Sequence, residues 1–402
     1  MRILSFTSQK EIKKIMHGIG VDPYGMKIML PKAINFTILL KGINNIAANI
    51  LKQEMLALGA DAAITRGALT GKTKKTDVLL IGSLAQFNSL KTKLKHQPFG
   101  LRSIGEELEK GIKDYFRDNF VLSLRKCSLD LGKRTHIMGI INVTPDSFSG
   151  DGLYRRGSSD FIGLALKKAE KMVEDGADII DVGGQSTRPG ARGISVIEEL
   201  RRVMPVIKLL SRSIKVPISL DKSKPEVAKA ALDAGAQIVN DICGLRDKRM
   251  IKLVAKYEAA VVIMHMLGKP VNMQTIISYH SLIDDIAVYL KNAIELAHSF
   301  GVKSDKIIID PGIGFGKNPV HNFQIIKRLS DFKVLGKPIL IGTSRKSFIA
   351  NVLGDHLQSR IIGTLANCVV AAQNGANILR VHDVKEVNQS LRIFEAIKNA
   401  DR

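Results

Sequence analysis

Polar and ionisable residues recur at the ends of apolar runs in the later two-thirds of the chain. Each of the following lies at the end of such a run or just after it: Asn142, Thr187, Arg188, Asp221, Asn240, His265, Asp310, Lys346, Arg380 and His382. Carboxylates and amides suit a ligand that presents N–H groups, whereas Arg, Lys and His suit a phosphorylated ligand. The residue types therefore predict a site that handles both kinds of group.

The runs that carry these residues are short, rich in Ile and Val, and separated by amphipathic helical stretches. They begin at His136, Ala177, Val216, Gln237, Ala259, Ile307, Ile339 and Asn377. Near-continuous apolar runs of this length are typical of strands buried on both faces, as in a parallel sheet. Several helical stretches end at a glycine (Gly176, Gly235, Gly375), which is expected just past a helix C-terminus.

Eight strands that alternate with helices over about 265 residues predict an α/β fold of the (β/α)₈ TIM-barrel type. A doubly wound open sheet is the rival, and the lack of a GxGxxG turn after the first strand disfavours it. In a barrel, the C-terminal ends of the strands form the rim where chemistry takes place. Any one rim residue could instead cap a helix or form a salt bridge, but eight strands that each deliver one favour a site.

Residues 1–127 are expected to form a small, separate α/β domain, and residues 128–402 the barrel. The segments FTILLKG, NIAANILKQEMLALG, DAAITRG and DVLLIG predict a strand, a helix and two strands. Helices from Leu84 to Lys95 and from Leu101 to Phe116 follow, with a linker around Lys126 to Arg134. The string GALTGKT, at 67–73, has three residues rather than four before GKT and precedes a strand, so we interpret it as a hairpin connection rather than a nucleotide-binding loop.

Composition limits the classes of protein to which the chain can belong. It has 402 residues, 45% hydrophobic and 24% charged, which suits two globular domains. No apolar stretch reaches the roughly 18 residues of a membrane span, and the start lacks the apolar core of an export signal. Cys127, Cys243 and Cys368 are too far apart in sequence for a metal-binding or disulfide framework. We expect a cytoplasmic protein without a membrane partner.

The formal net charge is +22, and its density differs along the chain. Residues 1–127 carry 21 Lys and Arg against 10 Asp and Glu, and the remainder carries 39 against 28. A basic surface attracts nucleic acid, anionic lipid or phosphorylated small molecules. With 5% aromatic residues and no Trp, a stacking platform for single strands is poorly supported, so we expect no specific nucleic-acid partner.

The motifs of the later part, in order, resemble those of the dihydropteroate synthases over about residues 135–400. They are MGIINVTPDSFSGDG (138–152), IIDVGGQSTRPGA (179–191), SLDKSKPEVA from Ser219, IVNDI (238–242), VVIMHM (261–266), DPGIGFGK (310–317), GTSRKS (342–347) and LRVHDV (379–384). The resemblance implies a transferase of folate biosynthesis that joins 6-hydroxymethyl-7,8-dihydropterin diphosphate to p-aminobenzoate. Its products would be 7,8-dihydropteroate and pyrophosphate, and it would be a homodimer.

The resemblance also implies roles for residues on the pterin side of the site. Asp221, Asn240 and Asp310 would hold the pterin ring, whose amino group and ring N–H match carboxylate and amide oxygens. Lys346 would contact both the pterin and the p-aminobenzoate side. Asp221, Asp310 and Lys346 are accordingly the predicted catalytic residues.

The diphosphate side would be built by other residues. Arg380 and His382 would bind the diphosphate; as cationic or donor groups on neighbouring inward positions, they should repel each other without it. Thr187 and Arg188 would contact p-aminobenzoate and diphosphate, with Phe148 and Phe315 as apolar walls. Asn142 would supply an oxygen to Mg²⁺, the expected cofactor, which is shared with substrate phosphates.

Three positions depart from the family pattern, and two questions stay open. The first loop reads FSGDG, which moves its acid to Asp151, and Gln185 and Lys222 stand where Glu and a small hydroxyl residue are usual. The alternative functions are a pterin-dependent methyltransferase that acts with a corrinoid protein, and a pterin- or nucleic-acid-binding protein without catalysis. Residues 1–127 have no assigned role beyond interface, regulation or stability.

Overall fold

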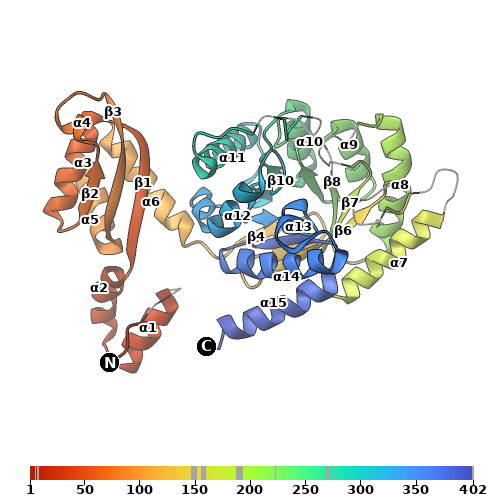
Figure 1. Ribbon diagram of the computed structural model, residues 1–402, viewed down its shortest axis with the longest axis horizontal. Coiled ribbons are helices and arrows are strands. Elements are labelled where there is room, and N and C mark those ends of the chain that lie inside the picture. Colours follow the sequence, from red (N-terminus) through yellow and green to blue (C-terminus); the bar gives the residue numbers. More distant parts are fainter. Residues whose placement is uncertain are drawn as a thin grey trace. The chain divides into compact units, whose positions relative to one another are not determined.

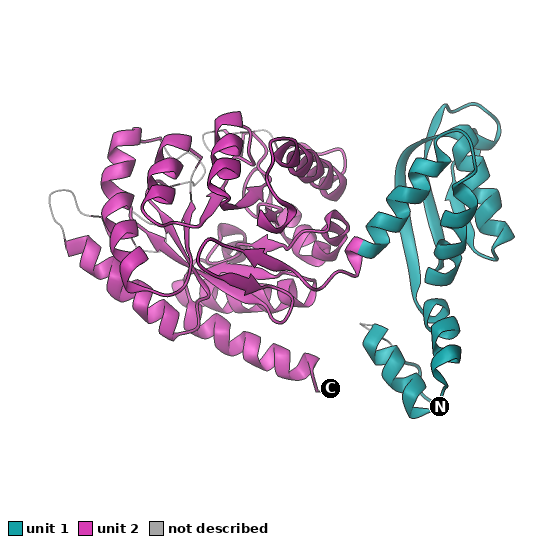
Figure 2. Ribbon diagram, turned by 180° about the vertical axis from the view of Figure 1, so that it is seen from behind, with its two compact units in different colours: residues 1–113, 401 teal, residues 114–400, 402 magenta. Residues whose placement is uncertain are grey.

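The structure is a computed structural model that describes residues 1–4, 6, 9–145, 152–154, 160–186, 193–221, 223–268, 272–275 and 277–400 (Figure 1). The chain divides into two compact units, residues 1–113 and residues 114–400 (Figure 2). The division falls between Lys113 and Asp114, which is earlier than the expected boundary at residues 127 and 128.

The N-terminal unit is built on a three-stranded antiparallel sheet in the order β1-β3-β2. Its strands are β1 (Asn35–Asn44), β2 (Asp61–Ile64) and β3 (Lys75–Ser83). Its helices are α1 (Gln9–Gly18), α2 (Pro23–Ala33), α3 (Asn45–Ala57), α4 (Arg66–Leu69), α5 (Leu84–Leu94) and α6 (Leu101–Tyr115). The expected strand, helix, two strands and two helices are all present in that order, but three helices were not expected: α1 and α2, which precede them, and the short α4 between the two strands.

Alternation in the strands and caps at the helices explain this arrangement. Val78 and Leu80 of β3 face a buried cluster with residues of α3, α5 and α6, so these helices cover one face of the sheet. Helix α5 begins with a capping box between Ser83 and Gln86. The GALTGKT segment begins within α4 and lies in the connection from β2 to β3, which pair antiparallel, as the strands of a hairpin do.

The larger unit is a barrel of eight parallel strands, and the expected fold class is confirmed. Its strands are β6 (His136–Asn142), β7 (Ile179–Gly183), β8 (Ile218–Asp221), β9 (Ile238–Asp241), β10 (Ala260–Met264), β11 (Ile307–Asp310), β12 (Leu340–Ile341) and β13 (Ile378–Val381). They pair in the order β11-β10-β9-β8-β7-β6-β13-β12. A parallel bridge between Ile309 and Ile339 joins β11 to β12 and closes the ring.

Helices follow the barrel strands and surround them (Figure 1). They are α7 (Asp160–Glu174), α8 (Val196–Ser213), α9 (Pro225–Asp233), α10 (Lys248–Tyr257), α11 (Leu282–Ser299), α12 (Pro319–Lys327), α13 (Ser347–Leu353), α14 (Leu357–Gln373) and α15 (Val384–Lys398), with short 3₁₀ turns at Ser304–Lys306 and Leu329–Leu335. Gly176, Gly235 and Gly375 follow α7, α9 and α14 with φ between 102° and 111°. Because L side chains rarely adopt such angles, glycine is the residue that ends these helices.

A short hairpin closes the N-terminal end of the barrel and explains the position of the unit boundary. It consists of β4 (Val121–Ser123) and β5 (Ser128–Asp130), which pair antiparallel. Phe120, Leu122 and Leu131 pack into one buried cluster with interior residues of the barrel strands. The expected linker around Lys126 to Arg134 is therefore wrong, because it contains β5, one of the two strands of this hairpin.

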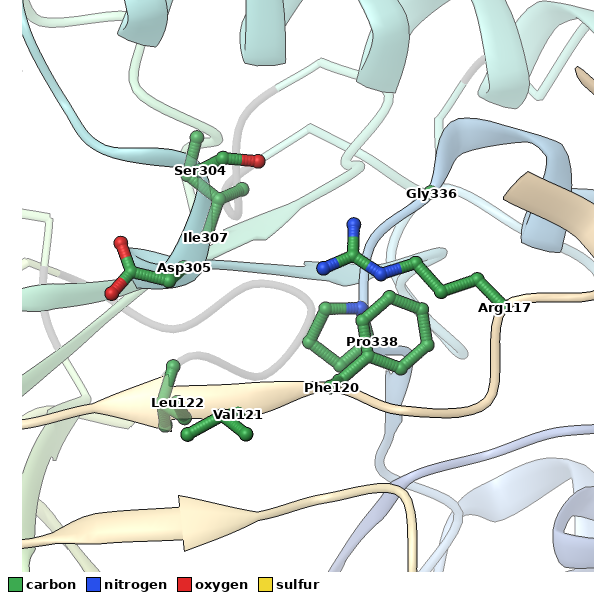
Figure 3. A pocket seen from close by; sticks show the side chains of 9 residues that line it. All are labelled: Arg117, Phe120, Val121, Leu122, Ser304, Asp305, Ile307, Gly336 and Pro338. Atoms are coloured by element: carbon green, nitrogen blue, oxygen red, sulfur yellow. The ribbon is translucent and has the colours of Figure 1, made fainter. Parts of the chain in front are cut away.

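A small pocket lies beside the hairpin, lined by residues of the segments 117–122, 304–307 and 336–338 (Figure 3). The guanidinium carbon of Arg117 lies 4.8 Å from the centre of the Phe120 ring. Ile307 begins β11, so the pocket is at the N-terminal end of the strands, opposite the rim where the polar residues lie. No helix among the described residues is long and apolar enough to cross a membrane.

Candidate active site

Strand alternation builds the site in layers inside the barrel. Met138, Ile179, Ile238, Ile308 and Ile378 form part of a buried apolar layer in the barrel interior. Residues two positions further along a strand face the same side, one layer nearer the C-terminal rim. Those positions carry Asp181, Asn240, Asp310 and Arg380, and Asp221 of β8 pairs in register with Asn240. Inside the barrel, a layer of polar side chains therefore lies directly on a layer of apolar side chains.

Arg380 lies between two carboxylates in this layer. Its Nε donates to Oδ2 of Asp181 at 2.6 Å, and its Nη2 donates to Oδ2 of Asp221 at 2.7 Å. Nδ2 of Asn240 donates to the same Asp181 oxygen at 3.2 Å. Asp181 is fully buried, so the cation is held on one side by a carboxylate that water does not reach.

Asp181 was missed by the sequence interpretation. A signal was present, because a carboxylate in the middle of the buried run IIDVGG has to meet a cation or a donor. Alternation also places it on the same face as Ile179, inside the barrel. The resemblance drew attention to the residues after this strand, and the strand itself was treated only as core.

Three acceptor atoms in the polar layer lack a partner among the described residues. Oδ1 of Asp181, Oδ1 of Asp221 and Oδ1 of Asn240 are buried and accept no hydrogen bond from the part of the chain that the structure describes. Buried polar atoms are nearly always satisfied, so such a group points to a ligand that donates several hydrogen bonds. Burial raises the pKa of Asp221 to about 6 although the charge of Arg380 opposes the shift.

Asp310 and the turn after it form the next part of the site. Its Oδ1 accepts a hydrogen bond from the backbone N–H of Gly312 at 2.7 Å, and burial raises its pKa to about 6. The following turn carries Phe315, whose ring centre lies 4.5 Å from Nζ of Lys346. Burial and the charge of Arg380 lower the pKa of Lys346 to about 8, against the pull of Asp310 and Asp221.

A strained residue sets the position of Lys346. Arg345, directly before it, has φ 55°, which a side-chain-bearing residue adopts only when its surroundings enforce it. Its backbone N–H donates to Oγ1 of Thr364 at 2.9 Å, and its guanidinium pairs with the carboxylate of Asp383. Nη1 of Arg360 donates to its carbonyl at 3.1 Å. Helix α14 and the end of β13 therefore hold the lysine at the rim.

His382 is held as a neutral donor, because the expected repulsion from Arg380 adds to burial in keeping a proton off its ring. Its backbone N–H donates to Oγ of Ser344 at 3.2 Å, and this hydroxyl lies 3.0 Å from Nδ1 of the ring. Burial and nearby Arg345 and Arg380 hold the pKa of His382 well below its usual range. A neutral ring whose Nδ1 accepts from the hydroxyl keeps its proton on Nε2. Arg380, for its part, already has two carboxylate partners.

Asn142 ends β6 on the interior side and lies next to Asp221. Gly183 of β7 stands between them: a Cβ there would be 3.6 Å from Oδ1 of Asn142 and 3.7 Å from Cβ of Asp221. The missing side chain keeps this end of the barrel open. Among the described residues, no three His, Cys, Asp or Glu side chains gather as a metal site. Asn142 alone fits a cation only if a substrate supplies further oxygen ligands.

Several residues named from the sequence lie outside the described part of the chain. They are Thr187 and Arg188, together with Phe148, Asp151 and Lys222. Gln185 is described, and its Oε1 accepts a hydrogen bond from Nζ of Lys224 at 3.1 Å. The structure thus brings together Asn142, Asp221, Asn240, Asp310, Phe315, Lys346, Arg380 and His382 at the C-terminal ends of the barrel strands.

Known proteins share this barrel and its motifs. Residues 138–382 match the family described as pterin binding enzyme. The dihydropteroate synthase of Synechocystis sp. is 42% identical over 288 residues, which cover 71% of this chain and 97% of the relative. The chain belongs to the dihydropteroate synthase family of pterin-binding enzymes. As a member of it, the protein is a transferase.

A solved structure supports the membership at the level of the fold. The dihydropteroate synthase of Xanthomonas albilineans with 4-aminobenzoic acid has a TM-score of 0.64 and 38% identity, and covers 70% of this chain and 98% of its own. The synthase match covers the barrel unit, which holds every candidate site residue of this chain. The first unit lies outside the pterin-binding family model.

A longer relative includes the first unit. A probable bifunctional folylpolyglutamate synthase/dihydropteroate synthase of Halobacterium salinarum is 37% identical over 381 residues, or 94% of this chain. Because so much of the chain is matched, most of the N-terminal unit must be included. The chain spans 45% of the length of this relative, less than half of it.

Proposed function

We propose that this chain condenses 6-hydroxymethyl-7,8-dihydropterin diphosphate with p-aminobenzoate to give 7,8-dihydropteroate and pyrophosphate. The observation that carries the proposal is the set of buried acceptors on Asp181, Asp221 and Asn240 that find no donor in the described part of the chain. A pterin ring presents an amino group and ring N–H groups along its edges, which is the donor pattern that such a set satisfies.

The remaining charged residues suit the rest of the pterin. Asp310 faces the barrel interior in the same layer, and Lys346 offers a cation to the pterin carbonyl and ring nitrogen. Arg380 is delocalised and planar, and its two carboxylate partners hold it inside the barrel near the ring. This arrangement favours a role of Arg380 against the pterin ring, beside the role in diphosphate binding expected from the sequence.

The chemistry is a substitution at the exocyclic methylene of the pterin. The C–O bond to the diphosphate breaks as the amine of p-aminobenzoate forms a C–N bond, and the amine then loses a proton. Pyrophosphate leaves with the electron pair of the broken bond. Lys346 over Phe315 would lie on the side from which the arylamine approaches, with the ring as an apolar wall. His382 would donate from Nε2 to the leaving group.

Mg²⁺ belongs to the proposal as a cofactor that arrives with the diphosphate. Asn142 would be its protein ligand, since the chain offers one amide oxygen there and hard cations bound with substrate phosphates keep water as well. When bound, Mg²⁺ would neutralise charge on the departing pyrophosphate. Thr187 and Arg188, which follow β7, would complete the p-aminobenzoate and diphosphate side.

A pterin-dependent methyltransferase is the alternative, because it would need a similar pterin pocket. It would transfer a methyl group to a corrinoid protein and release no pyrophosphate. The purified chain should be supplied with pterin diphosphate, Mg²⁺ and p-aminobenzoate, and the product identified by mass spectrometry. Formation of dihydropteroate supports the synthase, and methylation of a corrinoid acceptor without it would replace the proposal.

Two further features are proposed on the family membership. The enzyme would act in the cytoplasm, in keeping with three cysteines that form no disulfide. It would also be a homodimer. Neither property enters the catalytic proposal, which needs only the residues of one barrel.

A further inference from the structure

Lys317 is a buried lysine for which the proposed reaction has no direct use. The residue is 2% exposed, and its Nζ lies 2.9 Å from Nδ1 of His265 and 3.0 Å from the carbonyl oxygen of Phe315. The carbonyl oxygen of His265 is 3.5 Å away. All three partners are neutral acceptors for its N–H groups, and burial lowers the pKa of Lys317 to about 7. Burial of a lysine amino group costs free energy, so a lysine at this position needs a role other than packing.

His265 is arranged as the acceptor for this lysine. Burial and the charges of Lys317 and Arg246 lower the pKa of His265 to about 2, so the ring is neutral. Its Nδ1 accepts from Lys317, which leaves the proton on Nε2. The ring lies beside Tyr289 and Tyr279, with centre distances of 4.9 Å and 6.0 Å. The histidine is therefore a fixed anchor at the end of β10.

The turn between Gly312 and Lys317 packs closely against the segment that follows β10. Gly312 and Gly316 have φ 75° and 67°; a Cβ would lie 1.9 Å from the carbonyl oxygen of His265 at the first and 2.6 Å from Cβ of Leu267 at the second. Only glycine allows this approach. Lys317 forms hydrogen bonds to both segments: to His265 in the segment after β10, and to Phe315 in the turn itself.

Phe315 is the residue of the turn whose backbone accepts a hydrogen bond from Lys317. Its ring packs on a cluster that includes Met264, Met266 and Met273. Methionine side chains are unbranched and adaptable, so they fill the space under the ring without fixing it. The backbone of Phe315 must therefore be held, and its carbonyl accepts from Lys317. Above the ring lies Nζ of Lys346, at 4.5 Å.

We propose that Lys317 is a positioning residue that acts through Phe315. From beneath the site it ties the Gly312–Lys317 turn to His265 and so places the Phe315 ring under the Lys346 ammonium. This inference rests on the proposed function, in which Phe315 and Lys346 form the p-aminobenzoate side. The position of the ring can nevertheless be measured without any assay of activity.

A single tryptophan reports the ring position directly. The chain contains no Trp, so Phe315→Trp introduces the only indole of the protein. Adding Lys317→Met, which keeps the length of the side chain, should shift the indole emission to the red and increase its quenching by acrylamide. Unchanged emission and quenching would overturn the proposal. Should Lys317→Met not fold, His265→Phe removes the Nδ1 acceptor and is judged by the same two outcomes.

Lys306 provides a matched control. It is also buried, at 7% exposed, and its Nζ donates to the carbonyl oxygen of Ser123 at 2.5 Å, at the opposite end of the barrel. Lys306→Met in the Phe315→Trp chain should leave the indole emission as it was. An equal shift from Lys306→Met would mean that the loss of any buried lysine loosens the barrel, and the specific link would be rejected.

A double-mutant cycle tests the consequence for the reaction. Lys317→Met should raise the KM for p-aminobenzoate about tenfold and change the Kd of a bare pterin by less than about threefold. In a Phe315→Leu background the same substitution should add little, because the residue through which it acts is already gone. Additive effects would contradict the proposal. If the unsubstituted chain makes no dihydropteroate, the proposed function fails, and the fluorescence result still decides the role of Lys317.

Discussion

Arg380 and Asp181 form an ion pair inside the barrel, with Nε and Oδ2 2.6 Å apart. Asp181 is fully buried, whereas the Arg380 side chain keeps 19% of its surface exposed toward the rim. The second carboxylate partner, Asp221, faces the space that a pterin would occupy. Asp181 thus holds the cation from the buried side, and Asp221 pairs with it through Oδ2 while its Oδ1 accepts no hydrogen bond from the described residues.

Asp181→Asn should therefore weaken pterin binding although Asp181 has the deepest position of the layer. Without the charge of Asp181, Arg380 should pair fully with Asp221 and occupy an acceptor that the pterin needs. A hydrogen bond to a charged group contributes about 1.5–3 kcal/mol, so the Kd of a bare pterin should rise tenfold or more. Isothermal titration calorimetry measures the change.

Asp178→Asn is the matched control. Asp178 begins the same buried segment, but it pairs with Arg134 and His136 at the N-terminal end of the barrel. Its substitution should lower the thermal midpoint and leave the affinity for pterin unchanged. If Asp181→Asn binds pterin as tightly as the unsubstituted chain, the role given to the ion pair is wrong.

The strands, their order and most of the rim were predictable from the sequence, for a physical reason. Strands buried on both faces are apolar throughout, so a polar residue at the end of such a run stands out, as Asp221 and Asp310 do. Asp181 is in the middle of its run, and its partner Arg380 is 199 positions away, so the pairing depends on the closed ring of strands. The two carboxylate partners of Arg380 were not expected for the same reason.

The β4–β5 hairpin, which is the first part of the barrel unit, was not predicted because most of its packing partners are distant in the sequence. The strands β4 and β5 have three residues each, too short for a period to be recognised. The apolar side chains of this hairpin are buried against barrel strands, most of which lie far from it in the sequence. Similarly, α2 has no buried residue and contains Pro31, so its sequence shows little of the pattern that predicts helices in a core.

The β4–β5 hairpin at the N-terminal end of the barrel leads to a prediction about truncation. A chain that begins at Asp114 keeps β4 and should unfold at nearly the same urea concentration as the barrel in the full chain. A chain that begins at Lys126 loses Phe120 and Leu122 from the core. Burial of each such side chain contributes about 1.5–3 kcal/mol, so a loss of several kcal/mol is expected. Equal midpoints for the two chains would show that the hairpin is not part of the barrel core.

The pH dependence of pterin binding follows from the buried charges. Burial raises the pKa of Asp221 and of Asp310 to about 6, so these carboxylates lose their charge at a higher pH than ordinary aspartates. Affinity for a bare pterin should fall as the pH drops below about 6. Burial and Arg380 lower the pKa of Lys346 to about 8, so affinity should also fall above that pH.

Lys346→Ala separates the two limbs of this profile. The variant should fold, bind pterin more weakly near neutral pH, lose most turnover, and lack the alkaline limb while it keeps the acidic one. The Kd should be measured calorimetrically over about pH 5 to 9.5, with circular dichroism to confirm folding. An alkaline limb that survives the substitution would assign it to another group.

Metal binding should depend on the diphosphate. Because Asn142 supplies one neutral oxygen, Mg²⁺ alone should bind the chain too weakly for calorimetry to detect, and pterin diphosphate should bind at least tenfold more tightly when Mg²⁺ is present. Asn142→Ala should remove most of this Mg²⁺ effect and leave binding of a bare pterin unchanged. Tight Mg²⁺ binding in the absence of substrate would contradict this placement of the metal.

The most direct test of the central claim is the stoichiometry of the reaction. The full chain should be incubated with pterin diphosphate and Mg²⁺, with and without p-aminobenzoate, while pyrophosphate and dihydropteroate are measured together. The two products should form in equal amounts, and only when p-aminobenzoate is present. Pyrophosphate release that does not require p-aminobenzoate, or that yields no dihydropteroate, would contradict the assignment of the barrel rim as a synthase site.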